Sequence, residues 1–114
     1  MEIVVRRRDD VTILDVAGRI AGSDSLDLKR AIDAQIEIAA GNIAKIVLNL
    51  ERVRIVDSFG LGVIVAAYTS IQRNGGRIAL LNVGGNIKNL IVMAKLMTIF
   101  DRYDNEDEAV ASFQ

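Results

Sequence analysis

The sequence contains no cysteine and no histidine among its 114 residues. Without cysteine the chain has neither a disulfide nor a thiolate nucleophile. Without histidine it lacks the commonest general base and the commonest metal ligand, which excludes Ser-His-Asp triads and most zinc sites. No nucleotide-binding loop or paired-carboxylate motif is recognisable either. We therefore expect no catalytic residue, no metal and no cofactor, and an enzyme is the least favoured function.

Long apolar runs and an excess of one charge are also missing. No apolar stretch approaches the roughly 20 residues that span a bilayer, and the first residues do not resemble a signal peptide. Fourteen basic and fifteen acidic residues give a formal net charge of −1. The single basic run, residues 6–8, is followed by two aspartates, which favours a solvated strand end over a phosphate-binding patch. We expect a cytoplasmic protein with no membrane insertion and no nucleic-acid partner.

Alternating strand and helix patterns fill the chain, which has no proline and no low-complexity segment. Strand patterns cover residues 2–8, 11–17, 43–50, 77–83 and 98–103. Helical spacing covers residues 28–39 and 61–71, a segment after Asn86, and residues 104–112. The short polar turn at residues 9–10 indicates a hairpin, whereas the other strands are separated by helices and should be parallel. We predict one α/β domain over residues 1–114, with a mixed sheet of about five strands and about four helices.

The junction between the strand at residues 43–50 and the next helix is the most informative stretch. The helix should begin at Asp57 or Ser58, with Ser58 as the N-cap, because a serine oxygen there accepts a bond from a free backbone N–H group. Asp57 is an alternative cap, or it orients the serine hydroxyl. The same free N–H groups and the helix dipole suit a phosphate, so modification of Ser58 is the competing interpretation.

The outer face of this helix is unexpectedly apolar for a surface helix. At 100° per residue, the face opposite Leu61, Ile64 and Tyr68 has only one charged residue. Its members are Phe59, Gly62, Val63, Ala66, Ser70 and Arg73. Either another part of the domain covers this face, or it docks a partner protein.

Asp24 and Ser25 lie at the expected start of the first helix. Capping explains both residues, because Asp and Ser are the usual residues at helix starts. Their loop and Ser58 both follow strands, so the two segments are expected at the same end of the sheet. In that arrangement Asp24 and Ser25 form a second edge of a partner site.

The segment from Val56 to Ile64 resembles the signature of the STAS domain of bacterial anti-sigma factor antagonists. That signature typically reads Asp-Ser-Ser-Gly-Leu-Gly or Asp-Ser-Thr-Gly-Leu-Gly, and Gly18-Arg19-Ile20 resembles the first strand-to-helix turn of the same family. The resemblance implies a STAS-like fold over nearly the full length. It also implies that a partner serine kinase, itself the anti-sigma factor, phosphorylates a hydroxyl at this turn.

One residue departs from the family pattern. Phe59 replaces the usual second hydroxyl, so Ser58 is the only acceptor left at this turn. The resemblance thus implies an anti-sigma factor antagonist switched by phosphorylation of Ser58, with Asp57 as an accompanying site residue. The alternative is a STAS adaptor without phosphorylation, within a signalling assembly or beside a membrane transporter. A homo-oligomer is compatible with either function.

Overall fold

A computed structural model describes residues 1–84, 87, 94, 96 and 98–114. It contains one five-stranded sheet with the order β1-β2-β3-β4-β5. The strands are β1 (Glu2–Arg8), β2 (Val11–Ile20), β3 (Lys45–Val56), β4 (Arg77–Leu81) and β5 (Arg102–Tyr103). β1 and β2 are antiparallel, and each later neighbouring pair is parallel. The predicted mixed sheet is therefore confirmed.

The described residues form three helices and one short 3-10 turn. They are η1 (Gly22–Asp24), α1 (Ser25–Ala39), α2 (Ser58–Arg73) and α4 (Glu106–Ala111). The prediction of about four helices included one capped by Asn86, which lies largely outside the described residues. The strand predicted at residues 98–103 was too long, because Thr98 and Ile99 are helical and only Arg102 and Tyr103 pair with β4.

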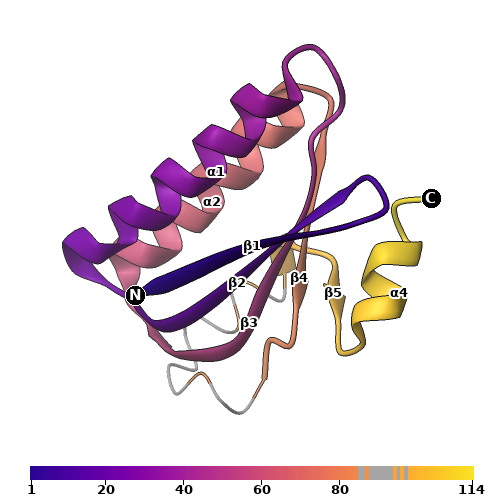
Figure 1. Cartoon of the computed structure of the whole chain (residues 1–114). Coiled ribbons are helices and arrows are strands. Elements are labelled where there is room, and N and C mark those ends of the chain that lie inside the picture. The colour runs from indigo at the N-terminus through magenta and orange to yellow at the C-terminus, as the bar shows by residue number, and fades with distance from the viewer. Residues whose placement is uncertain (85–86, 88–93, 95, 97) are drawn as a thin grey trace.

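Two layers of side chains form the core, one on each face of the sheet. α1 and α2 lie side by side on one face (Figure 1), over buried residues such as Leu14, Leu48 and Leu80. The short helix α4 packs on the other face. Its Ala109 and Val110 cover Val11, Ile13, Val47 and Leu81. The central strands are thus apolar on both faces where helices cover them, as expected for buried parallel strands.

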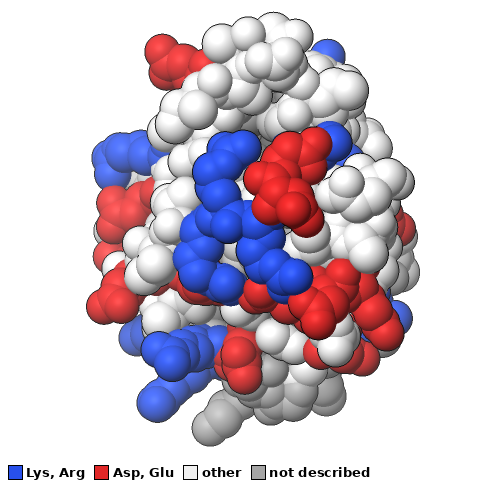
Figure 2. Space-filling view, turned by 45° about the vertical axis from the view of Figure 1, so that its right-hand side comes forward, with Lys and Arg blue, Asp and Glu red and all other residues white. Residues whose placement is uncertain are grey.

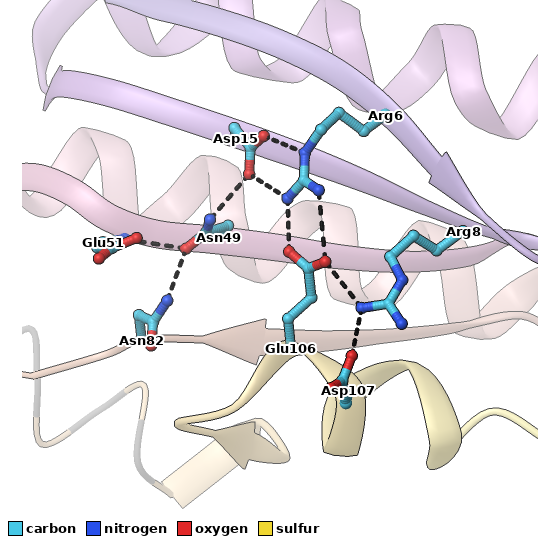
Figure 3. Close-up of polar contacts among 8 residues, drawn as sticks. All are labelled: Arg6, Arg8, Asp15, Asn49, Glu51, Asn82, Glu106 and Asp107. Atoms are coloured by element: carbon cyan, nitrogen blue, oxygen red, sulfur yellow. Dashed lines mark hydrogen bonds and ion pairs between the residues drawn. The ribbon is translucent and has the colours of Figure 1, made fainter.

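Beside the first turn of α4, the face of the sheet becomes polar (Figure 3). Arg6 Nη2 donates to Asp15 Oδ1 at 3.0 Å and to Glu106 Oε1 at 2.6 Å. Arg8 Nη1 donates to Glu106 Oε2 at 2.9 Å and pairs with Asp107 at 2.7 Å. The chain of bonds continues across the sheet, because Asn49 Nδ2 donates to the same Asp15 oxygen at 2.8 Å.

These contacts explain the basic run in β1. Arg6 and Arg8 form ion pairs with carboxylates, which agrees with the interpretation that the run is not a phosphate-binding patch. On the face shown in Figure 2, basic and acidic side chains lie next to one another. The Arg6 guanidinium holds the pKa of the Asp15 and Glu106 carboxyls below their ordinary values.

Candidate functional site

The start of α2 is held in place by Asp57. Its backbone is extended, with φ −89° and ψ −177°, whereas Ser58 is already helical. Asp57 Oδ1 accepts a hydrogen bond from the Gly60 N–H at 2.7 Å, so Asp57 is the N-cap. The prediction that Ser58 caps the helix was wrong, and the alternative assignment to Asp57 is confirmed. The Ser58 side chain is consequently not needed to cap the helix.

Asp57 also connects α2 to the segment between β2 and α1. Its second oxygen, Oδ2, accepts from the Gly22 N–H at 2.9 Å. The Asp57 N–H donates to the carbonyl of Ile20 at 3.2 Å, which fixes the end of β2 against the first turn of α2. One aspartate therefore orders both loops, and the expectation that they share one end of the sheet is confirmed.

Both backbone donors stabilise the charged form of this carboxylate. The N–H groups of Gly60 and Gly22 hold the pKa of Asp57 below its ordinary value of 3.8. Burial acts in the opposite direction but is outweighed, because the carboxylate stays open to solvent. At neutral pH a fixed negative charge therefore stands directly beside Ser58.

Acidification is expected to release the two loops from Asp57. Because its folded pKa is lowered, the stabilisation by the carboxylate is complete above the ordinary value of 3.8. It is lost as the pH falls through the lower folded pKa. The amide proton shifts of Gly22 and Gly60, followed by NMR, should titrate together with a midpoint below 3.8.

Two variants serve as controls for this titration. Asp57→Asn removes the titrating group, so the shared titration of the Gly22 and Gly60 amides should disappear. Asp24→Asn changes an exposed aspartate close to the same turn and should leave the titration in place. A common midpoint at or above 3.8, or separate midpoints for the two amides, would contradict the bidentate arrangement.

Ser58 and Phe59 form the exposed part of the first turn of α2. Ser58 is exposed, and 50% of the Phe59 side chain is accessible to solvent. Gly62 and Ala66, one and two turns further along, are also exposed. Ser58 contributes a hydroxyl and Phe59 an aromatic ring, and the small residues Gly62 and Ala66 continue the exposed side of the helix. We call Ser58, Phe59, Gly62 and Ala66 the α2 surface.

Val63 does not belong to this surface, although the helical spacing placed it there. It is 8% exposed and lies in the main core cluster. Val63 and Ala66 line a shallow hollow together with Lys29, Ile32 and Asp33 of α1. The interpretation that another part of the domain covers this face is thus confirmed for Val63 alone, whereas Phe59 and Gly62 stay open and docking of a partner there remains a prediction.

Asp24 and Ser25 differ in their accessibility. Asp24 is exposed and occupies the N-cap position of α1, but no side-chain capping hydrogen bond is present. Ser25 is the first residue of α1 and is fully buried, and its hydroxyl has no hydrogen-bond partner among the residues that the structure describes. Capping was therefore the wrong explanation for both residues. Of these two residues, only Asp24 is accessible at the surface.

A family model for the STAS domain matches residues 2–109. The chain belongs to the STAS domain family. The resemblance of the Asp57–Gly62 segment to the family signature is therefore confirmed by a match over nearly the whole chain.

Relatives of this STAS domain include anti-sigma factor antagonists. The anti-sigma F factor antagonist of Paenibacillus polymyxa is 29% identical over 114 residues, which cover 100% of this chain and 96% of that protein. A Thermotoga maritima crystal structure, provisionally assigned as an anti-sigma factor antagonist, is 28% identical with a TM-score of 0.77. That match covers 96% of this chain and 92% of the other.

A more distant structure supports the fold alone. The phosphorylated form of SpoIIAA, a cell fate determinant of Bacillus, is 18% identical with a TM-score of 0.71. The match covers 99% of this STAS domain and 100% of that chain. In the part of the chain that the structure describes, no helix has the length and apolar character to cross a bilayer. Within the same residues, no cluster of acidic side chains suits a metal ion.

Proposed function

We propose that this STAS domain is an anti-sigma factor antagonist that binds a serine-kinase anti-sigma factor and is switched by phosphorylation of Ser58. The observation that carries the proposal is the exposed Ser58 hydroxyl at the first helical position of α2. Asp57, the preceding residue, caps the helix without using the serine, and Phe59, the next residue, is exposed. A kinase can therefore reach the hydroxyl without unfolding the turn.

Phosphorylation would change the charge of the α2 surface. A phosphate adds about −1.5 to −2 charges at neutral pH. The N-terminus of the 16-residue helix α2 attracts the phosphate. The Asp57 carboxylate, fixed by two backbone N–H groups, repels it. The modified turn can thus persist while it no longer fits a partner that is complementary to the neutral hydroxyl.

The remaining α2 surface provides the docking area in the unmodified state. Phe59 offers an aromatic anchor of the kind that carries much of the binding energy in interfaces. Beyond it, apart from its chain neighbours and the nearby backbone of α2, Gly62 has no atom of the described residues within 4 Å of the position a Cβ would take, so a partner backbone can approach closely. Exposed Asp24 adds a second edge from the loop that Asp57 holds.

The first test is the intact mass of the protein purified from its native cells, with peptide mapping around Ser58. We expect a fraction that carries one phosphate, located on Ser58. Ser58→Ala should abolish this phosphate. Ser23→Ala, which changes another exposed serine near the same turn, should retain it. A phosphate that persists in Ser58→Ala would place the modification elsewhere and refute the switch.

A second test concerns the consequence of the charge. Ser58→Asp should weaken binding to the partner kinase by about tenfold or more, because a rigid negative charge is placed on the contact surface. Isothermal titration with the purified partner measures this change. Equal affinities for wild type and Ser58→Asp would count against a switch by charge.

Phe59 favours one alternative function, a STAS adaptor that binds constitutively. An exposed aromatic ring at this position increases the apolar contact area and replaces a hydroxyl. The adaptor function requires that no phosphate is found under any growth condition and that binding to a partner is retained. The mass measurement therefore separates the two functions.

A further inference from the structure

The outer edge of β1 is open in this domain. β1 is the first strand in the sheet order and pairs only with β2 among the described strands. In this order β1 and β5 are the two edge strands of the sheet. On such an edge the outward N–H and C=O groups have no sheet partner, and they form a template for one more strand.

The middle of this edge strand is apolar and exposed. Val4 and Val5 are 48% and 49% accessible to solvent. They are neighbours in sequence, so they lie on opposite faces of the strand. Val4 shares the open face with Glu2 and Arg6, which line the same hollow. Val5 shares the other face with Ile3, which packs against the main core.

We propose that β1 pairs with β1 of a second copy of this chain, antiparallel and centred on Val4. The two sheets then join into one continuous sheet about a two-fold axis. Val4 faces its own counterpart, Ile3 faces Val5 of the second copy, and Glu2 faces Arg6 of the second copy. Each strand thus contributes an apolar centre with an acidic residue at one end and a basic residue at the other, which is self-complementary only in an antiparallel pair.

The charged residues of β1 select this register. A two-fold axis perpendicular to the sheet keeps each side chain on its own face, so the neighbouring registers are centred on Ile3, Val5 or Arg6. Centring on Ile3 sets Val4 against Glu2 and leaves Arg6 without an acidic counterpart. Centring on Val5 sets Val4 against Arg6 and Ile3 against Arg7. Centring on Arg6 sets two arginines directly opposite one another, which is unfavourable. Charged residues on an edge strand restrict its pairing with other strands in this manner. Here they leave only the residues from Glu2 to Val5 available to pair with a second strand.

Disulfide trapping tests the proposed register, because the chain contains no cysteine. Directly opposite residues have Cβ atoms about 4.5–5.5 Å apart, close to the range that a disulfide bridges. Val4→Cys should form a disulfide-linked dimer under mild oxidation about tenfold faster than Ile43→Cys. Ile43 is a matched control because it is 60% exposed and lies outside β1.

The position of the cysteine distinguishes the registers. Val5→Cys should react more slowly than Val4→Cys, because in the proposed register the two Val5 side chains are diagonal, about 7–8 Å apart. Faster linkage of Val5→Cys would overturn the register. Linkage of Val4→Cys no faster than that of Ile43→Cys would overturn the pairing itself.

Sedimentation equilibrium tests the pairing without cysteine. The wild-type protein should dimerise as its concentration rises, and Val4→Lys should remain a monomer, because a lysine on an edge strand opposes strand addition. Circular dichroism at a concentration where the wild type is monomeric should show that Val4→Lys keeps its secondary structure and melting temperature. A wild-type protein that stays monomeric up to about 1 mM, where even weak pairs associate, would overturn the proposal and leave this edge to a strand of another protein.

Discussion

Gly60→Ala is expected to destabilise the domain by about 3 kcal/mol or more, in the range of severe core overpacking. A Cβ at this position would lie 2.0 Å from the carbonyl oxygen of Ile20 and 2.8 Å from its carbonyl carbon. Both atoms belong to the backbone, so no side-chain rotation relieves the clash. The end of β2 and the first turn of α2 would have to separate. Urea unfolding followed by circular dichroism measures the loss.

Gly62→Ala is the matched control on the same helix. Apart from its chain neighbours and the nearby backbone of α2, no atom of the described residues lies within 4 Å of the Cβ position at Gly62. Alanine is better than glycine in a helix interior, so Gly62→Ala should stabilise the domain by about 0.5–1 kcal/mol. Equal effects of the two substitutions would show that α2 does not pack against the end of β2 as described.

Arg6→Met is expected to cost about 1–2 kcal/mol of unfolding free energy at neutral pH, after allowance for solvent screening. The substitution keeps an apolar stem in place but removes the hydrogen bonds to Asp15 and Glu106. The side chains of these two carboxylates are only 30% and 28% exposed. Water can therefore replace the lost guanidinium hydrogen bonds only in part.

Arg54→Met is the control for this loss, because Arg54 is exposed on β3 and lies outside the bonds that Arg6 makes. Its unfolding free energy should stay within about 0.5 kcal/mol of the wild type. The cost of Arg6→Met should also shrink below the ordinary carboxyl pKa values of 3.8 and 4.5, because both values are lowered in the folded protein. A cost that is unchanged at low pH would contradict the ion-pair explanation.

Much of the fold could be predicted because helix and strand patterns alternate clearly along the chain. The hairpin at Asp9 and Asp10 and the helix over residues 28–39 follow from local signals that tertiary contacts did not override. The strand predicted at residues 98–103 failed for a physical reason. Strand propensity requires a partner to pair with, and only Leu80 and Leu81 of β4 pair with β5.

The local geometry of the candidate site was predicted with errors that only the tertiary structure corrects. Asp57 and Ser58 are both good capping residues, and the extended backbone of Asp57 decides between them. Val63 was placed on the outer face because the helical spacing was aligned on Leu61 and Tyr68, which prove to be only half-buried. The contact of α1 with Val63 has no signal in the local sequence.

The ion pairs of β1 were not predictable for a related reason. Arg6 reaches Glu106 across a separation of 100 residues, and no local pattern indicates such a contact. The mixed charges of the sequence predicted only that the basic run would be solvated. The structure shows instead that this run joins the first strand to α4.

The position of α4 at the end of the domain affects the order in which the fold is completed during protein synthesis. Until residues 106–111 have left the ribosome, Val11, Ile13, Val47 and Leu81 lack the buried Ala109 and Val110 of α4 that pack against them. A nascent chain can assemble β1 to β3 with α1, yet it carries this apolar face unprotected through most of its elongation. The domain therefore reaches its final form only after translation of α4, and a premature stop before Glu106 would yield a chain prone to aggregate.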